Sequence, residues 1–120
     1  MINVNVMRSF LNRLRDSGWK NINVRGNTYQ DTQVLRRGNK SIICVENINV
    51  EASGDIWPQI DEFFKSLMET ALKTDAKEIF LQGGNDFDLP RDFRDFCSDN
   101  GIKIHLITLK NYKEVIAGEI

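Results

Sequence analysis

Hydrophobic residues recur along this chain with two periods, and the period of about 3.6 residues marks the helical segments. The first apolar stripe runs from Met7 to Leu14. Asn5 is its expected N-cap, and Gly18 stands where a left-handed C-terminal cap is expected. Further helical segments are predicted from about Asp55 to Ala71, with Pro58 in the first turn; from Asp88, as N-cap, to Asn100-Gly101; and over Tyr112–Ala117.

Alternating or continuous apolar residues between these helices predict five strands. The run that begins at Ser41 is continuously apolar at first, which is typical of a strand buried on both faces. Gly38-Asn39 is expected to turn a hairpin, because both residues tolerate positive φ. The strands are expected at Trp19–Arg25, Asp31–Arg37, Ser41–Val50, Glu78–Gln82 and Ile102–Leu109. The element order α-β-β-β-α-β-α-β predicts a single α/β domain over residues 1–120.

The composition fits a small cytoplasmic domain. The chain has 120 residues, of which 41% are hydrophobic and 28% charged, enough for one ordinary core. No apolar run reaches the roughly 18 residues of a membrane span, and no secretory leader is visible at the N-terminus. Cys44 and Cys97 are far apart in the sequence and are expected to be buried free thiols. His105 has no Cys or His at ligand spacing, which argues against a zinc site.

Charge is distributed unevenly along the chain. Residues 1–40 hold eight Lys and Arg against two acids, a charge of +6, whereas residues 41–120 hold eight against fifteen, a charge of −7. This asymmetry favours either a face that prefers anions or a mixed surface in which the two halves interleave. The candidate nucleic-acid contacts are Arg36, Arg37 and Lys40 around the hairpin tip, together with Arg25.

Two acids of the predicted hairpin are the strongest candidate for chemistry. With the turn at Gly38-Asn39, position 31 should pair near position 46, which brings Asp31 toward Glu46. Two carboxylates that meet in a sheet repel each other unless a cation lies between them. Oxygen ligands of this kind suit Mg²⁺ or Mn²⁺. The alternative is that one carboxylate faces solvent or that each pairs with a Lys or Arg.

These residues and the element order resemble the PD-(D/E)xK restriction-endonuclease-like superfamily, in particular Mrr-type domains and Holliday-junction resolvases. The resemblance implies a three-layer sandwich with a mixed central sheet, in which Asp31 and Glu46 are the catalytic, metal-binding acids. It covers roughly residues 6–110. The local matches are Gly18-Trp19, Gln30-Asp31, Cys44–Ile48, Gly84–Phe87 followed by Pro90, and Asn100–Ile102.

The sequence also departs from that family at its active site. The position two after the second acid, where the family has Lys, is Ile48. An alkyl group there neither orients water nor stabilises charge on a phosphate. The first helix offers Arg8 where some relatives have Glu. Lys65 falls off the apolar stripe of its helix, and Lys40 lies about 20 Å along the strand from Glu46, so neither is expected to replace the missing Lys.

Two functions from different classes follow. The first is a nucleic-acid-associated protein with a degenerate nuclease site and weak or no metal-dependent cleavage. The second is an inactive protein–protein interaction module, of an inhibitor or immunity type, on the same fold. The basic first third of the chain favours the first function, and the isoelectric point of about 5.8 favours the second. A STAS-type regulatory fold is disfavoured, because that family places a helix between its early strands.

Overall fold

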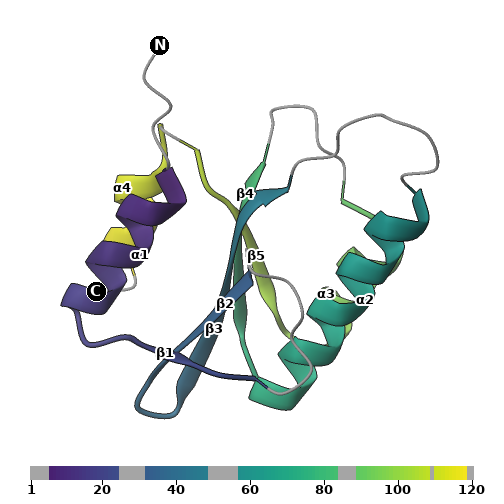
Figure 1. Cartoon of the computed structure of the whole chain (residues 1–120), viewed down its shortest axis with the longest axis horizontal. Coiled ribbons are helices and arrows are strands. Elements are labelled where there is room, and N and C mark those ends of the chain that lie inside the picture. The colour runs from purple at the N-terminus through teal and green to yellow at the C-terminus, as the bar shows by residue number, and fades with distance from the viewer. Residues whose placement is uncertain (1–5, 25–31, 49–56, 84–88, 109, 119–120) are drawn as a thin grey trace.

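The computed structural model describes residues 6–24, 32–48, 57–83, 89–108 and 110–118, which form an α/β fold of three layers (Figure 1). Helices α1 and α4 cover one face of the sheet, and α2 and α3 cover the other. The elements are α1 (Val6–Asp16), β1 (Lys20–Ile22), β2 (Thr32–Arg37), β3 (Lys40–Ile48), α2 (Trp57–Thr74), β4 (Glu78–Gly83), α3 (Arg91–Asp99), β5 (Lys103–Leu106) and α4 (Tyr112–Ala117).

The five strands form one open mixed sheet in the order β1-β2-β3-β4-β5. The first three strands are antiparallel to one another, whereas β3, β4 and β5 run parallel. The third strand, β3, therefore lies at the centre of the sheet and is hydrogen-bonded on both sides. The parallel pairs are joined by α2 and α3, which lie together on one face, as crossover connections require.

Burial on the central strand alternates between two cores, one on each face of the sheet. Ile42 and Cys44 of β3 belong to the core under α1 and α4, which includes Phe10 and Trp19. Ile43 and Val45 belong to the core under α2 and α3. Because successive side chains of a strand point to opposite faces, a continuous apolar run is what a strand covered on both sides needs.

Helices α1, α2 and α3 end in a similar way and lead directly into a strand. The Trp19 N–H donates to the Leu14 carbonyl, and the Ile102 N–H donates to that of Cys97, as in a Schellman motif. The residue in the left-handed region is Gly18 in one case and Gly101 in the other, with φ of 99° and 66°. In α2 the same position is held by Asp75, at φ 54°, which is uncommon for a residue with a Cβ.

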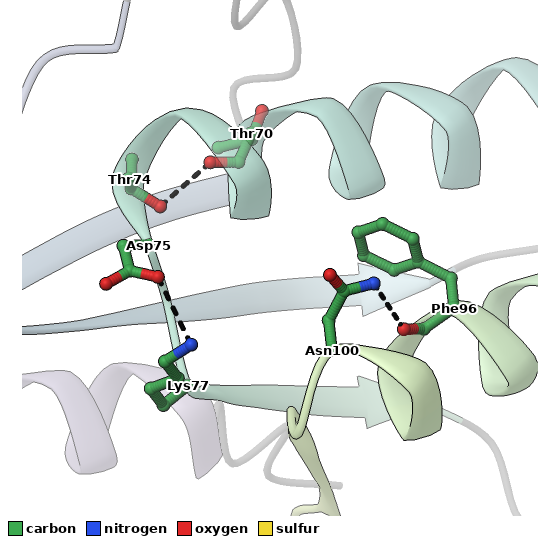
Figure 2. Close-up of polar contacts among 6 residues, drawn as sticks. All are labelled: Thr70, Thr74, Asp75, Lys77, Phe96 and Asn100. Carbon is green, nitrogen blue, oxygen red and sulfur yellow. Dashed lines mark hydrogen bonds and ion pairs between the residues drawn. The ribbon is translucent and has the colours of Figure 1, made fainter.

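The buried hydroxyls of α2 are satisfied within the helix. The Thr70 Oγ1 donates to the Ser66 carbonyl at 2.8 Å. The Thr74 Oγ1 donates to the Thr70 carbonyl, also at 2.8 Å (Figure 2). Such back-bonding lets a threonine face the core without an unsatisfied polar atom. None of the described helices is long and apolar enough to cross a bilayer.

Several element boundaries differ from those expected. The first strand is Lys20–Ile22. It begins one residue later than expected, because Trp19 completes the end of α1 and is 2% exposed, and it ends before Asn23. Helix α3 begins at Arg91 with Pro90 as its N-cap, so Leu89 precedes the helix instead of belonging to it. The last strand ends at Leu106. The expected caps Asn5 and Asp88 lie outside the described residues.

Candidate functional site

The hairpin that was expected to join the two acids has the expected register. Thr32 pairs with Val45, and Arg37 pairs with Lys40 at the tip. Glu46 follows Val45 on β3 and is half-buried. Asp31, its predicted partner in a metal site, lies outside the described residues. Among the residues that are described, no three His, Cys, Asp or Glu side chains gather as a metal site.

A register shift separates Glu46 from the position expected to complete the site. Val45 of β3 pairs with Leu81 of β4, but the next pair is Ile48 with Gly83, so β3 contributes one residue more than β4 across this step. A bulge of this kind interrupts strict alternation of side chains. In an unbroken strand Glu46 and Ile48, two residues apart, would share a face. The side chain of Ile48 lies outside the described part of the chain. Lys65 is exposed on α2, as expected.

Gln82, at the carboxyl end of β4, caps the beginning of α1. Its Oε1 accepts a hydrogen bond from the Met7 backbone N–H at 2.7 Å. The first N–H groups of a helix have no partner within the helix, so this contact joins the α1 N-terminus to the same end of the sheet that carries Glu46. Sequence reasoning missed this role, because no local pattern relates residues so far apart in the chain.

The two arginines expected to bind nucleic acid are engaged within the protein. The Arg36 Nε donates to the Ser41 Oγ at 3.1 Å. The Arg37 guanidinium lies 4.8 Å from the centroid of the Trp19 ring and donates to the Ser17 carbonyl at 3.4 Å. A cation over an aromatic face stabilises the fold, so Arg37 contributes to the junction of α1 and the hairpin. Arg25 lies outside the described residues.

Basic residues nevertheless gather at one end of the sheet. The strand registers bring basic residues of β1, β2, β3 and β5 to the end where β3, β4 and β5 begin, and Lys77 directly precedes β4 at that end. The helix termini at the same end carry both acidic and basic residues. Glu78, the first residue of β4, is an acid among the strand residues at this end. The basic strand-end residues are Lys20, Arg36, Arg37, Lys40, Lys77 and Lys103, which we call the basic end.

Three of these lysines surround a hollow of about 350 Å³. Lys40, Lys77 and Lys103 line it from the beginnings of three adjacent parallel strands, together with Ser41 and Glu78. Lys77 forms an exposed ion pair with Asp75 at 3.2 Å (Figure 2). Among the described residues, Lys40 and Lys103 have no acidic partner within ion-pair distance. Sequence reasoning had singled out only Lys40 of the three.

Glu78 is the negative charge of this hollow, and it is held by a histidine. The Glu78 Oε1 lies 3.1 Å from the His105 Nε2, with the two side chains 23% and 28% exposed. The His105 ring stacks on Phe80 at a centroid distance of 4.7 Å. His105 therefore has a structural role, because it contacts both Glu78 and Phe80 on the sheet.

The basic end and Glu46 lie at opposite ends of the sheet. Lys40 begins β3, and Glu46 lies six residues further along the same strand, a distance of about 20 Å. A phosphate bound at one end is thus not in contact with the other. The lysines also lie near the C-termini of α1, α2 and α3, whose carbonyls carry partial negative charge, so part of their effect is to stabilise the helices.

The two cysteines are free and buried, in agreement with the sequence prediction. Cys44 lies in the core under α1 and Cys97 in the core under α3. Burial raises the pKa of the Cys97 thiol to about 11. A thiol with a raised pKa is a poor nucleophile at neutral pH, so Cys97 is not a candidate catalytic residue.

Comparison with known proteins does not assign the chain to a family. No protein-family model matches the chain, and no curated protein matches it.

Proposed function

We propose that this domain binds the phosphate backbone of nucleic acid through its basic end and cleaves it weakly or not at all. The observation that carries the proposal is the presence of basic residues at the same end of β1, β2, β3 and β5, with Lys77 directly before β4. Backbone phosphates supply most of the affinity in non-specific nucleic-acid binding, and lysines and arginines provide it by displacing counterions. Lys20, Lys40 and Lys103 are all exposed, as such contacts require.

We propose further that the fold is a degenerate form of the PD-(D/E)xK nuclease fold. Support comes from the element order, the central position of β3 and the hairpin register beside Glu46. The absence of a lysine two residues after Glu46 supports loss of cleavage, because that group would stabilise charge on the reacting phosphate. Any metal-binding role of Asp31 and Glu46, with Mg²⁺ or Mn²⁺, belongs to this part of the proposal.

A salt titration tests the binding proposal. Fluorescence anisotropy of a labelled DNA duplex should give an association constant whose logarithm falls linearly with the logarithm of salt concentration, by about 0.9 for each phosphate neutralised. The Lys40→Gln variant should have a slope shallower by about 0.9, because it removes one exposed phosphate contact. Lys65→Gln, at a lysine that is also exposed but lies on α2, is the matched control and should leave the slope unchanged.

Absence of binding at low salt would refute the nucleic-acid proposal and favour the protein-interaction alternative. A slope that Lys40→Gln and Lys65→Gln change equally would show that binding depends on general charge and not on the basic end. The measurement uses the whole chain, and circular dichroism establishes that each variant is folded before its slope is compared.

A further inference from the structure

The hollow at the basic end differs from a flat basic surface in its shape. Its volume of about 350 Å³ is near the lower limit of small-ligand pockets, which run from about 300 to 1,000 Å³. Gly101 lies on its wall, and a Cβ built at this glycine would meet no atom within 4 Å, which shows that the space beside it is open. A volume of this size suits a group as small as a phosphate or a nucleotide and is far too small for a duplex.

The charge of the hollow matches a doubly charged anion. Three lysines and one glutamate line it, a net charge of +2. A phosphate monoester carries about −1.5 to −2 at pH 7, whereas a phosphodiester within a strand carries a single negative charge. The pair between Lys77 and Asp75 does not block the site, because both side chains are largely exposed and such surface pairs contribute little.

The arrangement of the lysines allows them to bind one group together. Adjacent strands of a sheet lie about 4.8 Å apart, and the registers place Lys40 two residues before the level of Lys103, so these two stems begin about 12 Å apart. Lys77 lies between them, about 6 Å from each. Each ammonium group is carried on a long flexible stem, and all three side chains line the same hollow. Lysines on a convex surface at this spacing would instead point apart into solvent.

From these observations we propose that the hollow binds a phosphate monoester, the group carried by a free nucleotide or by the phosphorylated end of a nucleic-acid strand. Lys40, Lys77 and Lys103 hold the phosphate oxygens. In the case of a strand end, the proposal deepens the nucleic-acid function proposed above and depends on it; for a free nucleotide it does not. The expected consequence is a preference for phosphorylated ends.

The test compares two single-stranded oligonucleotides of the same sequence, one with a 5′-phosphate and one with a 5′-hydroxyl, by anisotropy at one salt concentration. The phosphorylated strand should bind about tenfold more tightly, the size of one charge-assisted contact. Lys103→Gln should remove this difference, and Lys65→Gln should retain it. Glu78→Gln should increase the preference, because it removes the negative charge that opposes the anion.

Adenosine monophosphate and inorganic phosphate, added singly, distinguish the two sources of the group. In amide NMR spectra, both should shift the signals of Lys103 and its neighbours in the wild type but not in Lys103→Gln. If neither oligonucleotide binds while adenosine monophosphate still shifts these signals, the hollow is a small-molecule site and the nucleic-acid function fails alone. If both oligonucleotides bind equally and neither phosphate compound shifts the signals, the inference is overturned while the nucleic-acid function stands.

Discussion

Burial gives Cys97 a chemistry different from that of an exposed thiol. Its side chain lies in the core between α3 and the sheet, 1% exposed, where the charged thiolate is poorly solvated. This raises its pKa to about 11 from an ordinary value of 9.0. Because the thiol of the unfolded chain ionises at the lower pH, unfolding is linked to proton release over this window.

The unfolding free energy should therefore decrease from about pH 9 to pH 11, because the Cys97 thiol ionises more readily in the unfolded chain. Below this window the thiol is protonated in both states; within it, only the unfolded chain loses the proton, so the unfolded state gains stability. Compared with Cys97→Ala, the wild type should lose about 2 kcal/mol of unfolding free energy across the window. Urea denaturation of both proteins at pH 8, 9, 10 and 11 measures the difference, in which other titrating groups cancel.

A difference that stays constant from pH 8 to pH 11 would mean that Cys97 ionises as readily in the folded protein as in the unfolded chain. As a second measure, Cys97 should react with a thiol reagent at pH 8 only through opening of the core. Its reaction should therefore accelerate in concentrations of urea that approach the unfolding transition.

At the scale of elements, the ends of α1, α2 and α3 determine how each helix leads into its strand. Left-handed residues at Gly18, Asp75 and Gly101 reverse the chain within two residues. Only glycine takes this conformation without a steric cost from Cβ. The short connections that result bring Lys20, Lys77 and Lys103 to the same end of the sheet.

Gly101→Ala should lower the unfolding free energy by about 1 kcal/mol or more, because alanine is strained at a φ of 66°. Gly118→Ala is the matched control: that glycine ends α4 at a φ of −75°, where alanine is readily accommodated. Asp75→Gly should have the opposite effect to Gly101→Ala and raise stability by a few tenths of a kcal/mol, because it relieves the same strain. Urea denaturation at pH 7 measures all three.

Equal losses for Gly101→Ala and Gly118→Ala would contradict the account, since only the first position requires a positive φ. Asp75→Gly also removes the ion pair between Asp75 and Lys77, so its change in unfolding free energy has two causes. Asp75→Asn separates the two effects, because asparagine tolerates the left-handed region and removes the charge.

At the scale of the whole molecule, the two candidate sites lie at opposite ends of one sheet. Glu46 and the Gln82 contact to α1 lie where the parallel strands end, and the basic end lies where they begin. Ligands of open α/β sheets usually bind at the carboxyl ends of the strands. If the nuclease proposal is correct, substitutions at the basic end should change DNA binding, and substitutions near Glu46 should change any remaining cleavage.

The wild type should show almost no Mg²⁺- or Mn²⁺-dependent nicking of plasmid DNA, and Ile48→Lys should restore measurable nicking with Mn²⁺. A positive group at this position stabilises charge on the phosphate, and the loss of one such contact typically reduces rate by about 10²–10³. Adding Asp31→Ala should abolish the restored activity. Gel assays of supercoiled plasmid measure both, with Lys65→Arg as a folded control that keeps the charge.

Robust cleavage by the wild type would mean that another group replaces the missing lysine. A folded Ile48→Lys variant that neither cleaves DNA nor binds Mn²⁺ would show that Asp31 and Glu46 are structural. The restored nicking should leave DNA affinity measured without metal unchanged within about twofold, because a change this far along β3 does not alter the basic end.

The sequence by itself determined the elements, the hairpin register and the two faces of β3. These depend on local causes: apolar periodicity selects helix or strand, and the turn at Gly38-Asn39 sets which residues pair. Gly18 and Gly101 were likewise recognisable as helix ends. Boundaries such as the start of α3 differed, because Pro90 could take the N-cap position without a side-chain hydrogen bond.

Only the tertiary structure decided which distant residues meet. Linear charge counts separated a basic first third from an acidic remainder, yet Lys77 and Lys103 come from the acidic part and join Lys40 around one hollow. The cause is the parallel arrangement of β3, β4 and β5, which brings the beginnings of three distant segments to the same end of the sheet. Crossover helices of different lengths would bring the strand beginnings together equally well, so the spacing of these lysines in the sequence does not predict that they meet.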